Sequence, residues 1–141
     1  MATLATRPTA YHSSSTQPGI VPLVGRILIA AIFLLSGLSK LAAPAGTIAY
    51  IQAAGLPLPQ AGYALAVVTE LGAGLLLVLG YRTRIVAAWL AIFSLATAVA
   101  FHHNLADQNQ FIHFFKNVAM TGGLLQLVAF GGGRLSIDGG R

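Results

Sequence analysis

Residues 21–42 read VPLVGRILIAAIFLLSGLSKLA, a nearly unbroken run of apolar side chains with one cation toward each end. A helix rises about 1.5 Å per residue, so about 20 such residues are long enough to cross the hydrocarbon core of a bilayer. Pro22 falls in the first turn, where a helix tolerates proline because an N–H at that position has no partner within the helix. The stretch therefore predicts a transmembrane helix.

Three further apolar segments follow, at about residues 62–81, 85–102 and 111–130. Backbone amide and carbonyl groups find no partners in lipid, so only helices and closed barrels span membranes. The short alternating strands that build a barrel are absent from this sequence. The expected fold is therefore all-α, an integral membrane four-helix bundle.

The composition also indicates that lipid, and not water, surrounds most of the chain. Of the 141 residues, 56% are hydrophobic and only 8% are charged, against about 25% charged in soluble domains. The polar side chains are too few to cover a water-facing globule, so the lipid bilayer is the expected partner. The formal net charge of +5 does not indicate nucleic-acid binding, because the basic residues lie scattered at the segment ends.

The chain contains no cysteine. This excludes disulfides, thiol redox chemistry and thiolate metal sites. In any redox role the electrons must therefore travel through a bound cofactor, a quinone or a partner protein.

The predicted spans divide the chain into a disordered N-terminal tail (residues 1–19), a membrane domain (20–132) and a short C-terminal tail (133–141). Before the second span, residues 46–54 are expected to form a short helix at the membrane interface. Residues 81–84 form a tight turn, and residues 103–110 form a polar loop.

The arginines predict the orientation, because loops rich in Lys and Arg stay in the cytoplasm. With four spans, only Lys40 and Lys116 approach the outer side. The inner side collects all the other basic residues: Arg7, Arg26, Arg82, Arg84, Arg134 and Arg141. Both termini are therefore predicted to be cytoplasmic.

Ionisable residues inside a span cost about 2.5–3.5 kcal/mol each, so each needs a partner. Glu70 lies about eight residues into the second segment, roughly 12 Å from its outer end. Arg26 lies toward the inner end, where we expect it to serve a separate local role that closes the cytoplasmic side. The candidate partners of Glu70 share its outer half: Lys40, His102, His113, Lys116 and Asn117.

Three interpretations of Glu70 remain open. It forms a structural ion pair that fixes helix register, it belongs to a substrate, quinone or proton-relay site, or it is a neutral carboxyl with local hydrogen bonds. No metal site is expected, because the adjacent His102 and His103 do not share a helix face and no His-x3-His pair occurs.

Several short motifs occur in a recognisable order. They are Gly25-Arg26, Ser36-Gly37 with Lys40-Leu41, Gly55-Leu-Pro57, Glu70, Leu79-Gly80-Tyr-Arg-Thr-Arg84, Lys116-Asn117 with Gly122-Gly-Leu-Leu125, and Gly133-Arg134-Leu-Ser-Ile-Asp138. Together they make the chain similar to the DoxX family of small bacterial membrane proteins over nearly all of residues 20–138. The resemblance implies a multi-pass four-helix bundle in the inner membrane. It also implies that Arg26, Lys40, Glu70, Lys116 and Asn117 form the recurrent polar set.

The family takes its name from similarity to a subunit of an archaeal thiosulfate:quinone oxidoreductase, and some relatives are thought to tether redox or oxidative-stress enzymes. The first hypothesis is therefore a membrane subunit of a quinone-linked oxidoreductase, in which the polar residues bind the ligand and Glu70 relays a proton. The second is a non-catalytic anchor or assembly partner for redox proteins, and the third is a small proton-coupled transporter. Whether the chain is an enzyme stays open, as do homo-oligomerisation and the cofactor, for which the first hypothesis requires a quinone.

Overall fold

The computed structural model describes residues 19–140, which form helices and turns and no strand. The predicted tail up to residue 18, with Arg7, lies outside the described residues, as does Arg141. The all-α fold class is confirmed. The helices, in chain order, are α1 (Ile20–Ala42), α2 (Pro44–Ala53), α3 (Pro59–Val68), the π-helix η1 (Thr69–Ala73), α4 (Gly74–Leu79), α5 (Thr83–Phe101), α6 (Gln108–Phe130) and the 3-10 helix η2 (Ile137–Gly140).

Three of the described helices are long and apolar enough to cross a membrane. They are α1, the continuous Pro59–Leu79 helix made of α3, η1 and α4, and α5. The helix α6 equals α1 in length, at 23 residues. Its first half is more polar, with Gln108, His113, Lys116 and Asn117. A fourth span at α6 therefore stays a prediction.

Two connections differ from the sequence prediction. The polar loop expected at residues 103–110 is shorter, because Asp107 caps α6 and its side chain accepts a hydrogen bond from the Gln110 amide at 2.9 Å. Residues 108–110 are thus the first helical turn. The second span begins at Pro59, earlier than expected, because proline suits the first position of a helix. The predicted short helix is present as α2, Pro44–Ala53.

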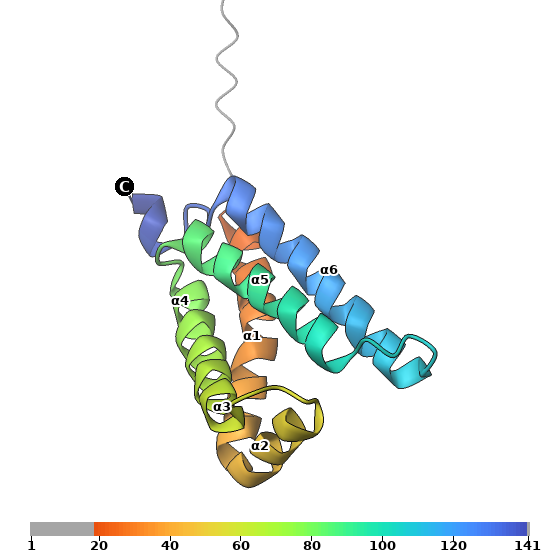
Figure 1. The fold of residues 1–141 in the computed structure, drawn as a ribbon. Coiled ribbons are helices and arrows are strands. Elements are labelled where there is room, and N and C mark those ends of the chain that lie inside the picture. The colour runs from red at the N-terminus through yellow and green to blue at the C-terminus, as the bar shows by residue number, and fades with distance from the viewer. Residues whose placement is uncertain (1–18, 141) are drawn as a thin grey trace, which may run out of the picture.

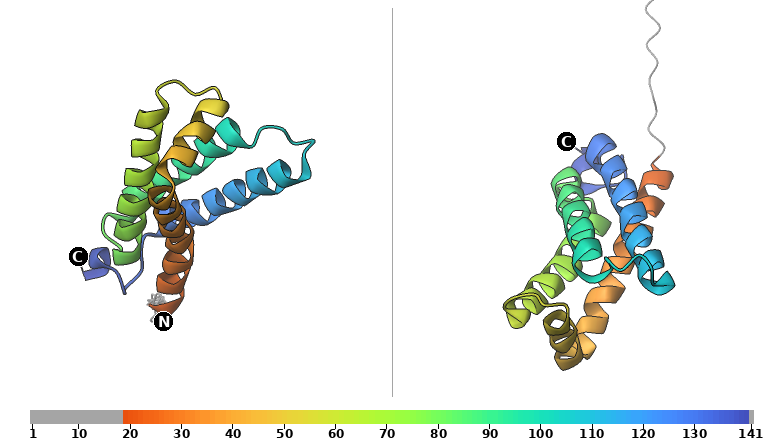
Figure 2. Two further views of the ribbon diagram at one scale, coloured as in Figure 1. Left: turned by 90° about the horizontal axis from the view of Figure 1, so that it is seen from below. Right: turned by 45° about the vertical axis from the view of Figure 1, so that its right-hand side comes forward.

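The helices converge at one end of the molecule and separate toward the other. In Figure 1, α1, α4, α5 and α6 lie close together near the C-terminus, whereas the α5–α6 hairpin turns away from α1 and α3 at the opposite end. Figure 2 shows the same divergence from below and places the start of α1 close to the C-terminal turn. Both ends of the described chain therefore lie at the converging end.

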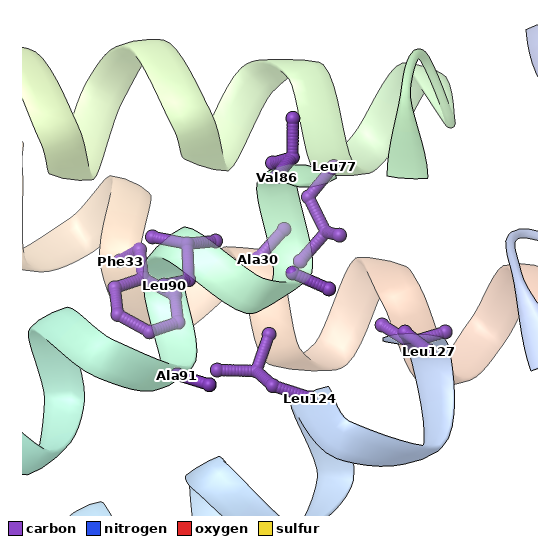
Figure 3. Close-up of a cluster of buried hydrophobic side chains, with 9 residues drawn as sticks. Ala30, Phe33, Leu77, Val86, Leu90, Ala91, Leu124 and Leu127 are labelled. Atoms are coloured by element: carbon purple, nitrogen blue, oxygen red, sulfur yellow. The ribbon is translucent and has the colours of Figure 1, made fainter. Parts of the chain in front are cut away.

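A small apolar core holds the converging half together. Figure 3 shows its buried side chains, which come from α1, α4, α5 and α6: Ala30, Phe33, Leu77, Val86, Leu90, Ala91, Leu124 and Leu127. Small residues bring α1 against the second span: a Cβ added at Gly37 would lie 2.7 Å from the Leu71 side chain. Such close backbone approach is how helices associate without a hydrophobic driving force.

The C-terminal segment folds back onto the turn between α4 and α5. Gly80 ends α4 in the left-handed conformation, with φ at 68°. The Asp138 carboxylate then accepts hydrogen bonds from the Arg82 and Thr83 amides, at 2.9 and 2.6 Å, and from the Thr83 hydroxyl at 2.8 Å. The predicted C-terminal tail is therefore a docked turn that caps the start of α5.

Candidate functional site

Glu70 lies on the π-helix η1, and its side chain is buried, with 5% of the residue exposed. A π-turn inserts one residue into a helix and frequently occurs at functional sites. The neighbouring Thr69 is also buried, and its hydroxyl accepts a hydrogen bond from Trp89 Nε1 at 3.3 Å. The widened turn is thus held against α5 beside the carboxylate.

Lys40 is the basic partner of Glu70. Its Nζ lies 2.8 Å from both carboxylate oxygens and donates a third hydrogen bond, also 2.8 Å long, to Ser36 Oγ. The Ser36 hydroxyl in turn donates to Glu70 Oε1 at 3.2 Å. An ammonium has three donors, so Lys40 is fully used. A carboxylate accepts about four hydrogen bonds, so Glu70 retains one acceptor position.

This network lies at the wall of a cleft of about 450 Å³ between the diverging helices. The remaining lining is largely apolar and comes mainly from α2, α3 and α5. Tyr50 of α2 and Phe101 of α5 lie along it with stacked rings, their centroids 5.3 Å apart. The cleft therefore combines one buried ion pair with aromatic and aliphatic walls, as small-molecule sites commonly do.

Two other predicted residues also line the cleft, His102 and Asn117. The His102 ring stacks on His113 at 5.0 Å between centroids, and Asn117 Nδ2 donates to the His113 carbonyl at 3.2 Å. His102 follows the last residue of α5. Burial chiefly lowers its pKa from the ordinary value of 6.5, and the charges of His113 and Lys116 lower it further. The neutral imidazole is therefore favoured beside the cleft.

Lys116 is not brought to Glu70. Its side chain is exposed, does not line the cleft and forms no hydrogen bond or ion pair within residues 19–140. Helical spacing explains the difference: Asn117 turns toward α5 and the cleft, and its neighbour lies about 100° around the helix. Lys40 is therefore the cation that Glu70 uses.

Arg26 lies outside the cleft lining and is completely buried at the converging end. Its guanidinium donates to the carbonyls of Gly132, Leu135 at 2.8 Å and Val78 at 3.3 Å. It stands 14 residues before Lys40, or about 21 Å along α1. Arg26 thus ties α1 to α4 and to the C-terminal segment, and its expected role on the cytoplasmic side stays a prediction.

Sequence reasoning missed Ser36 and the π-turn. Ser36 could have been found, because it stands one helical turn before Lys40 and shares its face. The π-turn has no comparable signal in the sequence. It follows from tertiary packing around Thr69 and Glu70.

The sequence of the chain matches the profile of the DoxX family over residues 21–103, more than half of its length. The chain belongs to the DoxX family. It is 40% identical to the inner membrane protein YqjF of Escherichia coli strain K12 over 119 residues, covering 82% of this chain and 88% of YqjF. It is 36% identical to the inner membrane protein YphA of the same strain over 133 residues, covering 91% and 95%. No solved structure matches it significantly.

Proposed function

We propose that this DoxX-family protein is a multi-pass protein of the bacterial inner membrane that binds a quinone-type ligand as the membrane subunit of a quinone-linked oxidoreductase system. The names of both relatives support the inner membrane. The main support for a bound ligand is the Lys40–Glu70 pair, which lies at the wall of an apolar cleft of about 450 Å³. A charged pair at membrane depth is expensive, so its placement at an open cleft favours a functional role.

The hydrogen-bonding capacity of the cleft suits a ring that carries oxygen atoms. Glu70 has one acceptor position left, which a hydroxyl of the reduced ligand would fill. Asn117 Nδ2 uses one of its two N–H groups on His113, so the second would donate to a carbonyl of the oxidised ligand. In this arrangement Glu70 relays the protons that the quinone takes up when the partner's electrons reduce it to the quinol, and Lys40 and Ser36 hold its carboxylate in place.

The apolar walls suit the rest of such a ligand. Tyr50 and Phe101 present stacked aromatic surface to a planar ring, and aliphatic residues line the remainder of the cleft. The electrons would come from a partner protein, because the chain itself has no cysteine.

A non-catalytic anchor or assembly partner is the second candidate, and one observation favours it. All three donors of Lys40 are used by Glu70 and Ser36, so the Lys40 ammonium needs no ligand as a hydrogen-bond partner. A buried ion pair of this kind is also what fixes helix register in purely structural cases. The two candidates differ in whether the cleft binds anything.

Trp89 provides the test, because it is the only tryptophan of the chain and contacts Thr69 beside Glu70. Purified protein in detergent is titrated with a short-chain quinone and with its quinol while tryptophan fluorescence is recorded. We expect saturable quenching. Ala66→Phe, which fills the cleft, should abolish saturation, whereas Ala64→Phe, on the exposed side of the same helix, should leave it unchanged.

Glu70→Gln keeps the size of the side chain and separates the two candidates. We expect it to weaken quinol binding about 10-fold or more, because a hydrogen bond to a charged acceptor is worth roughly 1.5–3 kcal/mol. Thermal unfolding of each variant shows whether the fold is kept. Quenching that never saturates, or that saturates equally in Ala66→Phe, would contradict quinone binding in the cleft. The role of a non-catalytic anchor would then be the remaining candidate.

A further inference from the structure

A second cleft, of about 690 Å³, lies at the converging end, and its lining shares no residue with that of the cleft beside Glu70. It lies between the α4–α5 turn and the segment that follows α6. Its lining includes three arginines, Arg82, Arg84 and Arg134, together with the glycine segment 131–133. We propose that this cleft binds a phosphate-type anion, either the phosphodiester headgroup of an anionic lipid or free phosphate.

The charges of the described residues that line the cleft are unbalanced. Among them, three guanidinium groups face one carboxylate, that of Asp138. Asp138 already accepts hydrogen bonds from the Arg82 and Thr83 amides and from the Thr83 hydroxyl. Within residues 19–140, none of the three arginine side chains donates a hydrogen bond or forms an ion pair. Like charges gathered in this way repel one another, and an anion shared among them removes the repulsion.

The donors suit phosphate in particular. A guanidinium offers planar paired N–H groups that match the oxygens of a phosphate. Of the glycines beside them, Gly132 and Gly133 pack closely against Thr83 and Pro22, whereas Gly131 has only Arg84 nearby. A Cβ added at Gly131 would lie 3.5 Å from Arg84 Nε, so this guanidinium lies directly against the glycine segment. A ligand at the arginines could therefore approach the main chain closely.

The rim of the cleft favours a lipid as the source of the phosphate. Ile85 and Phe130 belong to the lining, and both are largely exposed, at 63% and 67%. They would contact the acyl chains while the arginines hold the headgroup. Basic clefts at the ends of transmembrane helices bind anionic headgroups in this way, each cation contributing about a factor of five in affinity.

Native mass spectrometry of the full-length protein in detergent tests the proposal. The protein is titrated with phosphatidylglycerol, with zwitterionic phosphatidylcholine and, separately, with inorganic phosphate. We expect phosphatidylglycerol to stay bound at least 10-fold more tightly than phosphatidylcholine. The Arg82→Gln/Arg84→Gln variant should lose roughly 30-fold in affinity for phosphatidylglycerol. Lys116→Gln removes an exposed cation outside this cleft and should lose almost none.

The outcomes separate the sources of the anion. Competition by inorganic phosphate alone, with no preference for phosphatidylglycerol, supports the arginine site with free phosphate as its ligand. Equal retention of both lipids without an effect of phosphate overturns the proposal. An equal loss in the Arg82→Gln/Arg84→Gln and Lys116→Gln variants overturns it as well, because the effect would then be one of net charge. If the double variant does not fold, the lipid preference of the unmodified protein still decides.

Discussion

The helix α1 carries two cations that the protein treats in opposite ways. Arg26 is completely buried and donates to three backbone carbonyls, without a carboxylate among its hydrogen-bond partners. Lys40 remains 24% exposed and is paired with the Glu70 carboxylate beside a cleft. The carbonyls at Arg26 are the unsatisfied ends of a helix and a loop, so this cation completes the packing. The Lys40 ammonium instead stabilises the ionised Glu70 carboxylate within the membrane domain.

This difference coincides with the two ends of the molecule. Where Arg26 ties α1 to α4 and to the C-terminal segment, the helices converge around the apolar core. Toward the opposite end, the α5–α6 hairpin turns away from α1 and α3 (Figure 2). The cleft beside the Lys40–Glu70 pair lies between these diverging helices. Stability should therefore depend most on the converging end, and binding of the proposed quinone on the diverging end.

Replacing Arg26 should have the largest effect on stability. Arg26→Met keeps much of the volume but leaves three carbonyls without their donor, which should lower the free energy of unfolding by about 3–5 kcal/mol. Arg26→Lys should recover part of the loss, because an ammonium cannot match the fork of the guanidinium. Thermal unfolding in detergent measures both. A loss under about 1 kcal/mol in Arg26→Met would show that the carbonyls find other donors.

Breaking the Lys40–Glu70 pair should have a smaller effect and a characteristic coupling. Lys40→Met or Glu70→Leu alone leaves one charge without its partner and should lower the free energy of unfolding by about 2–3 kcal/mol. The double variant should lose less than either single variant, since apolar pairs often replace buried ion pairs without penalty. Additive losses in the double-mutant cycle would mean that the two side chains act independently.

The polar residues beside Glu70 and those at the converging end were predictable from the sequence to different degrees. Span length and the position of Glu70 predicted that it would need a cation from its own half, and Lys40 provides it. Lys116 met the same depth criterion but lies on another face, which depends on how α6 packs on α5. The docking of Asp138 onto the α4–α5 turn involves residues 55 and 56 positions apart, so no local pattern indicates it.

The smallest effect should come from His102, which lines the cleft beside Glu70. Burial, and secondarily the charges of His113 and Lys116, lower its pKa below the ordinary 6.5. As the pH falls below 6.5, the unfolded chain binds the proton first, so stability is complete above that value and decreases as the pH falls through the lowered pKa. His102→Asn should remove this part of the loss of stability at low pH. His103→Asn, at an exposed neighbouring position, should leave the loss unchanged. Melting temperatures of the three proteins at pH 8 and pH 5 provide the comparison. If His102→Asn and the unmodified protein lose equal stability over that range, another group causes the loss.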